Sequence, residues 1–303
     1  MKRLLSVASL AAALVLIAAC APRENRTAAA ASPAAAIPYG ANKDTGATFV
    51  HDGVTLYYEV YGQGEPLLLV HGNGGSIGTF AAQIEHFKTT YKVIAMDSRD
   101  HGRSADTQEP ITYEKMTDDL AALIDHLKVG PVDVLGWSDG GIEALLLGIR
   151  HPDKVKKIVS MAANLSPGPE AFDPEIDALI KSQMELPDEV KNTPEGKRQL
   201  KVTGMMLTEP NIPTDMLGKV MAPTLVLASD NDLIRLDHIL TIYKSLPNAE
   251  LGIFPHSTHL IPYDDPERFD SAVDRFLATP FRKIDRIPET MGSLEKMLAA
   301  LPH

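Results

Sequence analysis

The chain has 303 residues, of which 44% are hydrophobic and 23% are charged, as in ordinary globular proteins and unlike disordered or collagen-like chains. This length fits one α/β domain of about 250 residues or two smaller domains, and either buries a core that needs no disulfide or metal for stability. The formal net charge of −11, without clusters of Lys or Arg, argues against a nucleic-acid partner, because phosphate binding requires a basic surface.

The N-terminal segment has the pattern of an export signal. Lys2 and Arg3 precede an uncharged run of 16 residues from Leu4 to Ala19. A helix that spans a membrane needs about 20 apolar residues, so this run fits the apolar region of a signal peptide better. A plain signal peptide or an N-terminal anchor would share this pattern.

The end of the apolar run carries a more specific feature. Ile17-Ala18-Ala19-Cys20 resembles the lipobox of bacterial lipoproteins, in which the cysteine is lipidated and becomes the new N-terminus; Cys20 is the chain's single cysteine. We therefore expect a signal peptide over residues 1–19 and a lipidated Cys20 that anchors the exported protein to the bacterial cell envelope. The residue after the cysteine is Ala21 and not aspartate, which resembles Gram-negative lipoproteins that are sorted to the outer membrane. We therefore expect the protein at the outer membrane, facing the periplasm.

Residues 20–45 are expected to form a flexible tether. Seven of the nine residues at 28–36 are alanine, and Pro33 and Pro38 make a continuous helix unfavourable. A coil of about 25 residues reaches roughly 25–30 Å, which is enough to hold a folded domain off a membrane surface.

The region from 46 to 280 is predicted to be one α/β domain, because short apolar segments that indicate strands alternate with amphipathic segments that indicate helices. The expected strands are 54–61, 66–70, 91–96, 132–137, 155–161, 224–228 and 250–254. The expected helices are 113–128, 141–150, 236–246 and 266–277. This order predicts a mostly parallel central sheet flanked by helices.

Two segments depart from this alternation. Residues 165–220 follow the fourth core parallel strand, hold seven prolines and have only weak helical patches such as 175–184. An insertion of this length favours a small lid over a site. Residues 281–303 carry apolar side chains at helical spacing, so we expect a C-terminal helical extension that packs on the periphery of the domain.

A candidate nucleophile lies where the third expected core strand meets the following helix. Gly136-Trp137-Ser138-Asp139-Gly140-Gly141 places G-x-S-x-G in a strand–turn–helix context, which is the setting that gives this motif its specificity. Glycines beside Ser138 fit a crowded, strained turn, and a helix start directs backbone N–H groups at a developing anion. We therefore predict Ser138 as the nucleophile.

Glycines also follow an earlier buried strand, in His71-Gly72-Asn73-Gly74-Gly75. They let the backbone approach a ligand, so the backbone N–H groups of Asn73 and Asp139 are the candidate oxyanion hole. We expect the His71 side chain itself to be structural.

A serine nucleophile also requires a base and an acid that orients it, later in the chain. Asp232 and His259 each follow an expected parallel strand, at the sheet edge where sites of α/β proteins collect. Asp230 is an alternative acid and His256 an alternative base.

Together these features resemble the α/β-hydrolase superfamily over roughly residues 50–279. The segment from Asp97 to Ser104 resembles the motif D-x-R-G-H-G-x-S, with Asp100 where glycine is common. Gly-Trp-Ser-Asp-Gly-Gly is similar to the biphenyl-hydrolase-like and related carboxylester hydrolases, and serine at 138 excludes the branches with an aspartate nucleophile. The resemblance implies a small-molecule substrate and no cofactor.

The leading hypothesis is hydrolysis of a small carboxylic ester or lactone through an acyl-enzyme on Ser138, with His259 as base and Asp232 as orienting acid. Carbon–carbon bond hydrolases, cofactor-free perhydrolases and aminopeptidases use a similar triad and stay open. A non-catalytic binding module that kept the fold is a more remote alternative. For the Asp139 side chain, two interpretations are open: it binds a substrate ammonium, or it faces the surface and stabilises the helix N-terminus.

Overall fold

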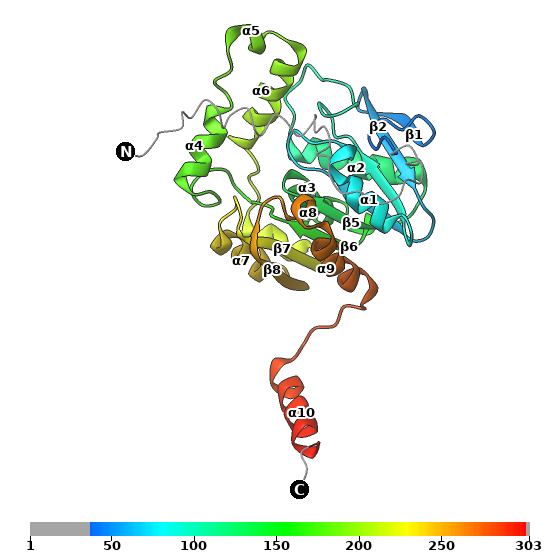
Figure 1. The fold of residues 1–303 in the computed structure, drawn as a ribbon, viewed down its shortest axis with the longest axis vertical. Helices are drawn as coiled ribbons and strands as arrows, with labels where there is room; N and C mark the ends of the chain where they lie inside the picture. Colours follow the sequence, from blue (N-terminus) through cyan, green and yellow to red (C-terminus); the bar gives the residue numbers. More distant parts are fainter. Residues whose placement is uncertain (1–36, 301–303) are drawn as a thin grey trace, which may run out of the picture.

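The computed structural model describes residues 37–300 and contains one eight-stranded sheet flanked by helices (Figure 1). The strands are β1 (Gly46–His51), β2 (Val54–Tyr61), β3 (Pro66–Val70), β4 (Lys92–Met96), β5 (Val132–Trp137), β6 (Val155–Met161), β7 (Thr224–Asn231) and β8 (Ala249–Thr258). The helices are α1 (Ala81–Phe87), α2 (Tyr113–Leu127), α3 (Asp139–Arg150), α4 (Pro174–Ser182), α5 (Asp188–Lys191), α6 (Pro194–Met206), α7 (Leu236–Ser245), α8 (Ile261–Asp264), α9 (Pro266–Ala278) and α10 (Arg286–Ala299), with 3₁₀ turns η3 (Ile77–Phe80), η4 (Pro152–Lys154) and η5 (Thr214–Lys219).

The sheet has the order β1-β2-β4-β3-β5-β6-β7-β8. The pairs β1–β2 and β2–β4 are antiparallel and the other pairs are parallel. Among the helices, α1 contacts α9 and α2 contacts α3. The predicted fold class, a mostly parallel sheet flanked by helices, is confirmed.

Burial on both faces explains why the central strands β3 and β5 are apolar apart from Asp133. All residues of β3 and β5 are buried, including Asp133 in β5, as expected where helices cover a parallel sheet on both sides. Helix α2 shows the end signals of an amphipathic helix: the Thr112 side chain accepts a hydrogen bond from the Lys115 N–H, and Lys128 ends it in the left-handed region.

The parallel strands all point their carboxyl ends to one edge, and the loops from that edge carry the candidate residues. The β3 loop holds Asn73, the β5 turn holds Ser138, and the loops after β7 and β8 hold Asp232 and His259. This placement is the one expected for a site in an open α/β sheet.

The start of the folded part differs from the prediction. The expected signal peptide, Cys20 and most of the tether lie outside the described residues. Gly40 and Asn42, which were expected in the tether, donate their backbone N–H groups to the buried Glu59 carboxylate, both at 2.8 Å. A carboxylate in the interior needs such donors, so the domain begins before residue 46.

The segment between β6 and β7 contains more helix than its sequence suggested. Helices α4, α5 and α6 and the turn η5 lie in it, and the three helices project from the domain beyond the sheet in Figure 1. Helix α4 falls on the weak patch at 175–184, whereas α6 was not expected, because no apolar side chain follows Pro194 in the first six residues of its sequence PEGKRQLKVTGMM.

The C-terminal segment forms a helix but does not pack on the domain. Helix α10 lies apart at the end of an extended connection in Figure 1, and none of its residues is buried. The expected packing is therefore wrong: the apolar side chains of its stripe, such as Ile287, Met291 and Leu294, are exposed. Among residues 37–300, no helix has both the length and the apolar character to cross a membrane.

Candidate active site

Ser138 occupies a strained turn between β5 and α3. Its φ of 58° and ψ of −119° lie where residues other than glycine are rare. A Cβ on Gly136 would lie 2.0 Å from the Gly140 carbonyl oxygen, and a Cβ on Gly140 would lie 1.9 Å from that of Val70. Both glycines are therefore needed for the backbone to turn this sharply.

The loop after β3 lies directly against this turn. Strands β3 and β5 are neighbours, with Val70 opposite Gly136, and a Cβ on Gly72 would be 3.0 Å from the Ser138 Cβ. Asp139 is the first residue of α3, so its backbone N–H has no acceptor within the helix. The two predicted oxyanion residues, Asn73 and Asp139, thus belong to adjoining backbone segments beside Ser138.

Buried polar groups hold the β3 loop in place. His71 Nε2 accepts a hydrogen bond from the Ser98 N–H at 3.1 Å, which leaves Nδ1–H to donate to the Gly72 carbonyl at 2.8 Å. Burial lowers the pKa of His71 to about 4, so the ring stays neutral. The Asp97 carboxylate accepts from the N–H groups of Ile77 and Arg103, both at 2.7 Å, while burial raises its pKa to about 6.

The candidate base and acid contact each other. His259 Nδ1 lies 2.6 Å from Asp232 Oδ1, and the Asp232 carboxylate is buried and accepts further hydrogen bonds from the N–H groups of Ser229 and Ile234. The indole N–H of Trp137, the residue before Ser138, donates to the His259 carbonyl at 2.9 Å. The two rings also lie near each other, with centroids 5.6 Å apart.

The alternative acid and base lie elsewhere. Asp230 is exposed, and its carboxylate accepts from the backbone N–H groups of His256 at 2.8 Å and Ser257 at 3.1 Å, which lowers its pKa. His256 is exposed and has a φ of 52°. The geometry therefore pairs His259 with Asp232, whereas Asp230 accepts hydrogen bonds from the backbone of the neighbouring turn.

Asp139 does not face the surface, so that interpretation of its side chain is wrong. Its carboxylate is buried: Oδ1 accepts from the Tyr113 hydroxyl at 2.8 Å and Oδ2 from Asn73 Nδ2 at 2.9 Å. Burial raises the pKa of Asp139 to about 6, and these two hydrogen bonds and His259 oppose the rise. The sequence interpretation missed Tyr113, because a tyrosine at a helix start gives no signal of a partner 26 residues away.

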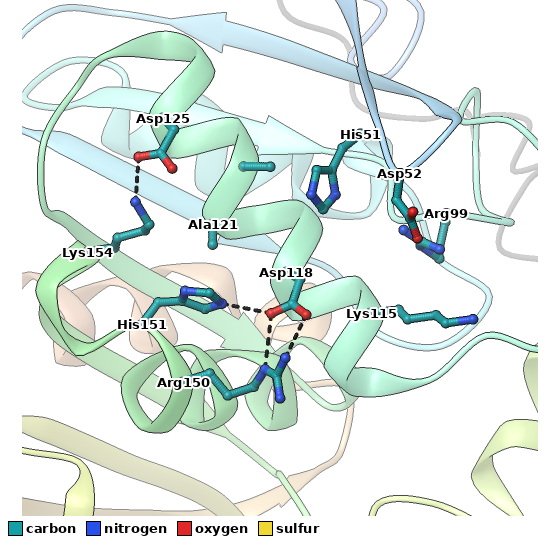
Figure 2. A pocket seen from close by; sticks show the side chains of 11 residues that line it. His51, Asp52, Arg99, Lys115, Asp118, Ala121, Asp125, Arg150, His151 and Lys154 are labelled. Carbon is teal, nitrogen blue, oxygen red and sulfur yellow. Dashed lines mark hydrogen bonds and ion pairs between the residues drawn. The ribbon is translucent and has the colours of Figure 1, made fainter.

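A groove of the described part lies away from these residues. It measures about 700 Å³ beside α2 and is lined by charged side chains, among them Arg99, Asp118 and His151 (Figure 2). Some of these side chains contact one another: Asp118 pairs with Arg150 at 2.6 Å and lies 2.7 Å from His151 Nε2. Within residues 37–300, no group of three or more His, Cys, Asp or Glu side chains is arranged to hold a metal ion.

Comparison with known proteins identifies the family. A family model described as the alpha/beta hydrolase fold matches residues 65–201. RutD of Caulobacter sp. (strain K31), which carries the name carbamate hydrolase, is 31% identical over 258 residues, covering 74% of this chain and 96% of RutD. The chain belongs to the α/β-hydrolase superfamily.

Two further relatives agree with this assignment. The human serine hydrolase BPHL is 29% identical to this α/β-hydrolase over 275 residues, covering 82% of this chain and 90% of BPHL. The structure of a hydrolase from Pseudomonas aeruginosa matches with a TM-score of 0.67 at 22% identity, covering 78% of this chain and 100% of that one. The protein is therefore an enzyme of the hydrolase class.

Proposed function

We propose that the protein hydrolyses a small carboxylic ester or lactone through an acyl-enzyme formed on Ser138. The observation that carries this proposal is the 2.6 Å contact between His259 and Asp232, on loops beside the strained serine turn. A buried carboxylate bound to one ring nitrogen of a histidine orients the ring and stabilises its protonated form.

In the acylation step His259 acts as general base. Its Nδ1–H donates to Asp232, so Nε2 takes the proton of the Ser138 hydroxyl as the oxygen attacks the substrate carbonyl. The backbone N–H groups of Asn73 and Asp139 donate to the oxyanion of the tetrahedral intermediate. Loss of one such donor typically raises the barrier by about 3–4 kcal/mol.

His259 also carries the protons in the collapse of the first intermediate and in the deacylation that follows. Protonated His259 gives its proton to the leaving alkoxide, then removes a proton from the water that attacks the acyl-enzyme. As this second tetrahedral intermediate collapses, His259 returns the proton to the Ser138 oxygen and the carboxylic acid product leaves, so Ser138 and neutral His259 are regenerated. The serine hydrolase name of BPHL supports the nucleophile, and the carbamate hydrolase name of RutD supports an acyl-type carbonyl as the reacting group.

The test is turnover of a panel of activated esters. Initial rates on p-nitrophenyl acetate, butyrate and octanoate and on a simple lactone are compared for the wild type and Ser138→Ala. We expect turnover by the wild type on at least one substrate and none above background for Ser138→Ala. Equal turnover by the two proteins would refute the nucleophile.

We further propose that Cys20 is lipidated and anchors the enzyme to the bacterial cell envelope, at the outer membrane and facing the periplasm. The sequence pattern at Ile17-Ala18-Ala19-Cys20 supports this. Membrane fractionation of the full chain and of Cys20→Ser tests it. The wild type should sediment with outer membranes and Cys20→Ser should not; identical distributions would contradict the anchor.

A further inference from the structure

The loop after β4 contains a strained residue whose side chain holds the lid. Asp100 has a φ of 60°, in the left-handed region that favours glycine, and glycine is what the resembled motif commonly has there. A side chain at such a φ destabilises the turn unless its contacts compensate. Asp100 is only 2% exposed, so its carboxylate needs partners in the interior.

Those partners are the loop's own Thr107 and a lysine of lid helix α6. The Asp100 carboxylate accepts hydrogen bonds from the Thr107 N–H at 2.9 Å, from its hydroxyl at 2.7 Å and from Lys201 Nζ at 2.8 Å. Lys201 Nζ also donates to the Thr107 carbonyl at 2.7 Å and to the Thr107 hydroxyl, so all three of its donors are used. An ion pair at this depth is screened little by salt.

The next residue of α6 touches the candidate oxyanion loop. Asn73 Nδ2 donates to the Val202 carbonyl at 3.2 Å and to Asp139 Oδ2 at 2.9 Å. The Asn73 amide group is thus held between the lid and the first turn of α3. A continuous set of contacts runs from Asp100 through Lys201 and Val202 to Asn73.

We propose that Lys201 is a positioning residue. Its ion pair with Asp100 fixes α6, and the Val202 carbonyl of α6 then holds Asn73 so that the Asn73 backbone N–H is directed at the oxyanion. This inference rests on the oxyanion role given to Asn73 under the proposed function. It assigns the predicted lid a part in the chemical step. Misplacement of a catalytic group by about 1 Å can cost up to 10²-fold in rate.

The test uses Lys201→Met, which keeps the aliphatic stem, and Asp100→Gly, which suits the backbone at this φ and so preserves the turn. Arg198→Met is the matched control, because Arg198 on the same helix pairs with Asp106 at a more exposed position. Two quantities are measured on the full chain: hydrogen exchange of 194–206, and the saturation kinetics of Ser138 labelling by a fluorophosphonate.

For Lys201→Met and for Asp100→Gly we expect faster exchange in α6 and a maximal labelling rate lowered about tenfold, with the half-saturating concentration unchanged. The double variant should be no slower than either single one, because both remove the same contact. Arg198→Met should change each quantity by less than about twofold.

Faster exchange with an unchanged labelling rate, or no change in either quantity, would overturn the proposal. Additive losses in the double variant would also overturn it, since the two residues would then act separately. If wild-type Ser138 does not react at all, the proposed function fails, and the oxyanion part of this proposal with it. The exchange data would still decide whether Lys201 anchors α6.

Discussion

The two sides of the candidate site are built differently. On the nucleophile side, Ser138 and its neighbours are fixed by close backbone packing, in which glycines leave room for no side chain. On the base side, Asp232 and His259 come from two separate loops and meet through side chains. The steric requirements of one turn produce a motif that can be recognised in the sequence. A contact between two loops produces no such motif, because the sequence does not distinguish the contacting residues from similar residues nearby.

The largest effect is expected on the base side, where two aspartates lie two residues apart in the sequence. Asp232→Asn should lower kcat by about 10⁴-fold, because an amide cannot stabilise protonated His259 and favours the wrong tautomer. Asp230→Asn is the matched control and should stay within about threefold of the wild type, since Asp230 contacts only backbone and the neighbouring Asn231. Steady-state kinetics on the best ester checks both, and a reversed order would assign the acid to Asp230.

On the nucleophile side, the corresponding change is steric. Gly140→Ala should lower the free energy of unfolding by about 4 kcal/mol or more, although alanine favours helices, because its Cβ would lie 1.9 Å from the Val70 carbonyl oxygen. Gly218→Ala is the control: a Cβ there meets nothing within 4 Å, so about 0.5 kcal/mol is the most expected. Denaturant unfolding compares them, and equal stabilities would show that the turn is not crowded.

The loops behind the nucleophile side also predict a pH dependence of stability. Burial lowers the pKa of His101 to about 3, against 6.5 for the ordinary side chain, so the unfolded chain binds a proton there that the folded protein does not. His101 therefore contributes stability that is lost as pH falls below about 6.5 towards the folded pKa, by about 2 kcal/mol between about pH 7 and pH 5. His101→Asn can keep a hydrogen-bond donor to the Arg99 carbonyl. Between the same pH values its free energy of unfolding should fall by about 2 kcal/mol less than that of the wild type. Parallel pH profiles for the two proteins would contradict the neutral, buried ring.

A smaller effect sharpens the role of Asp139. Its carboxylate is occupied by Asn73 and Tyr113, so Asp139→Asn should lower kcat about tenfold and to the same extent on plain acyl and aminoacyl esters. The paired rates check this. A loss confined to aminoacyl esters would instead support binding of a substrate ammonium by Asp139.

Strands, motifs and the fold class were readable from the sequence because they depend on local pattern. Strand β5 and strand β6 have the predicted bounds, since the mostly apolar second half of each strand ends where a turn begins. Helix α6 was not readable, because its sequence lacks a clear apolar stripe and the buried contact of Lys201 with Asp100 leaves no signal in the sequence. Helix α10 gave the opposite error: its apolar spacing predicted a helix correctly, but spacing carries no information about a packing partner.

The most direct test of the central claim is the site at which a fluorophosphonate reacts with the enzyme. Peptide mass mapping after labelling should find a single adduct on Ser138 in the wild type. Ser138→Ala, with unchanged thermal unfolding, should carry none. An adduct on another residue, or an unlabelled wild type that still hydrolyses esters, would contradict the account of Ser138 as the nucleophile.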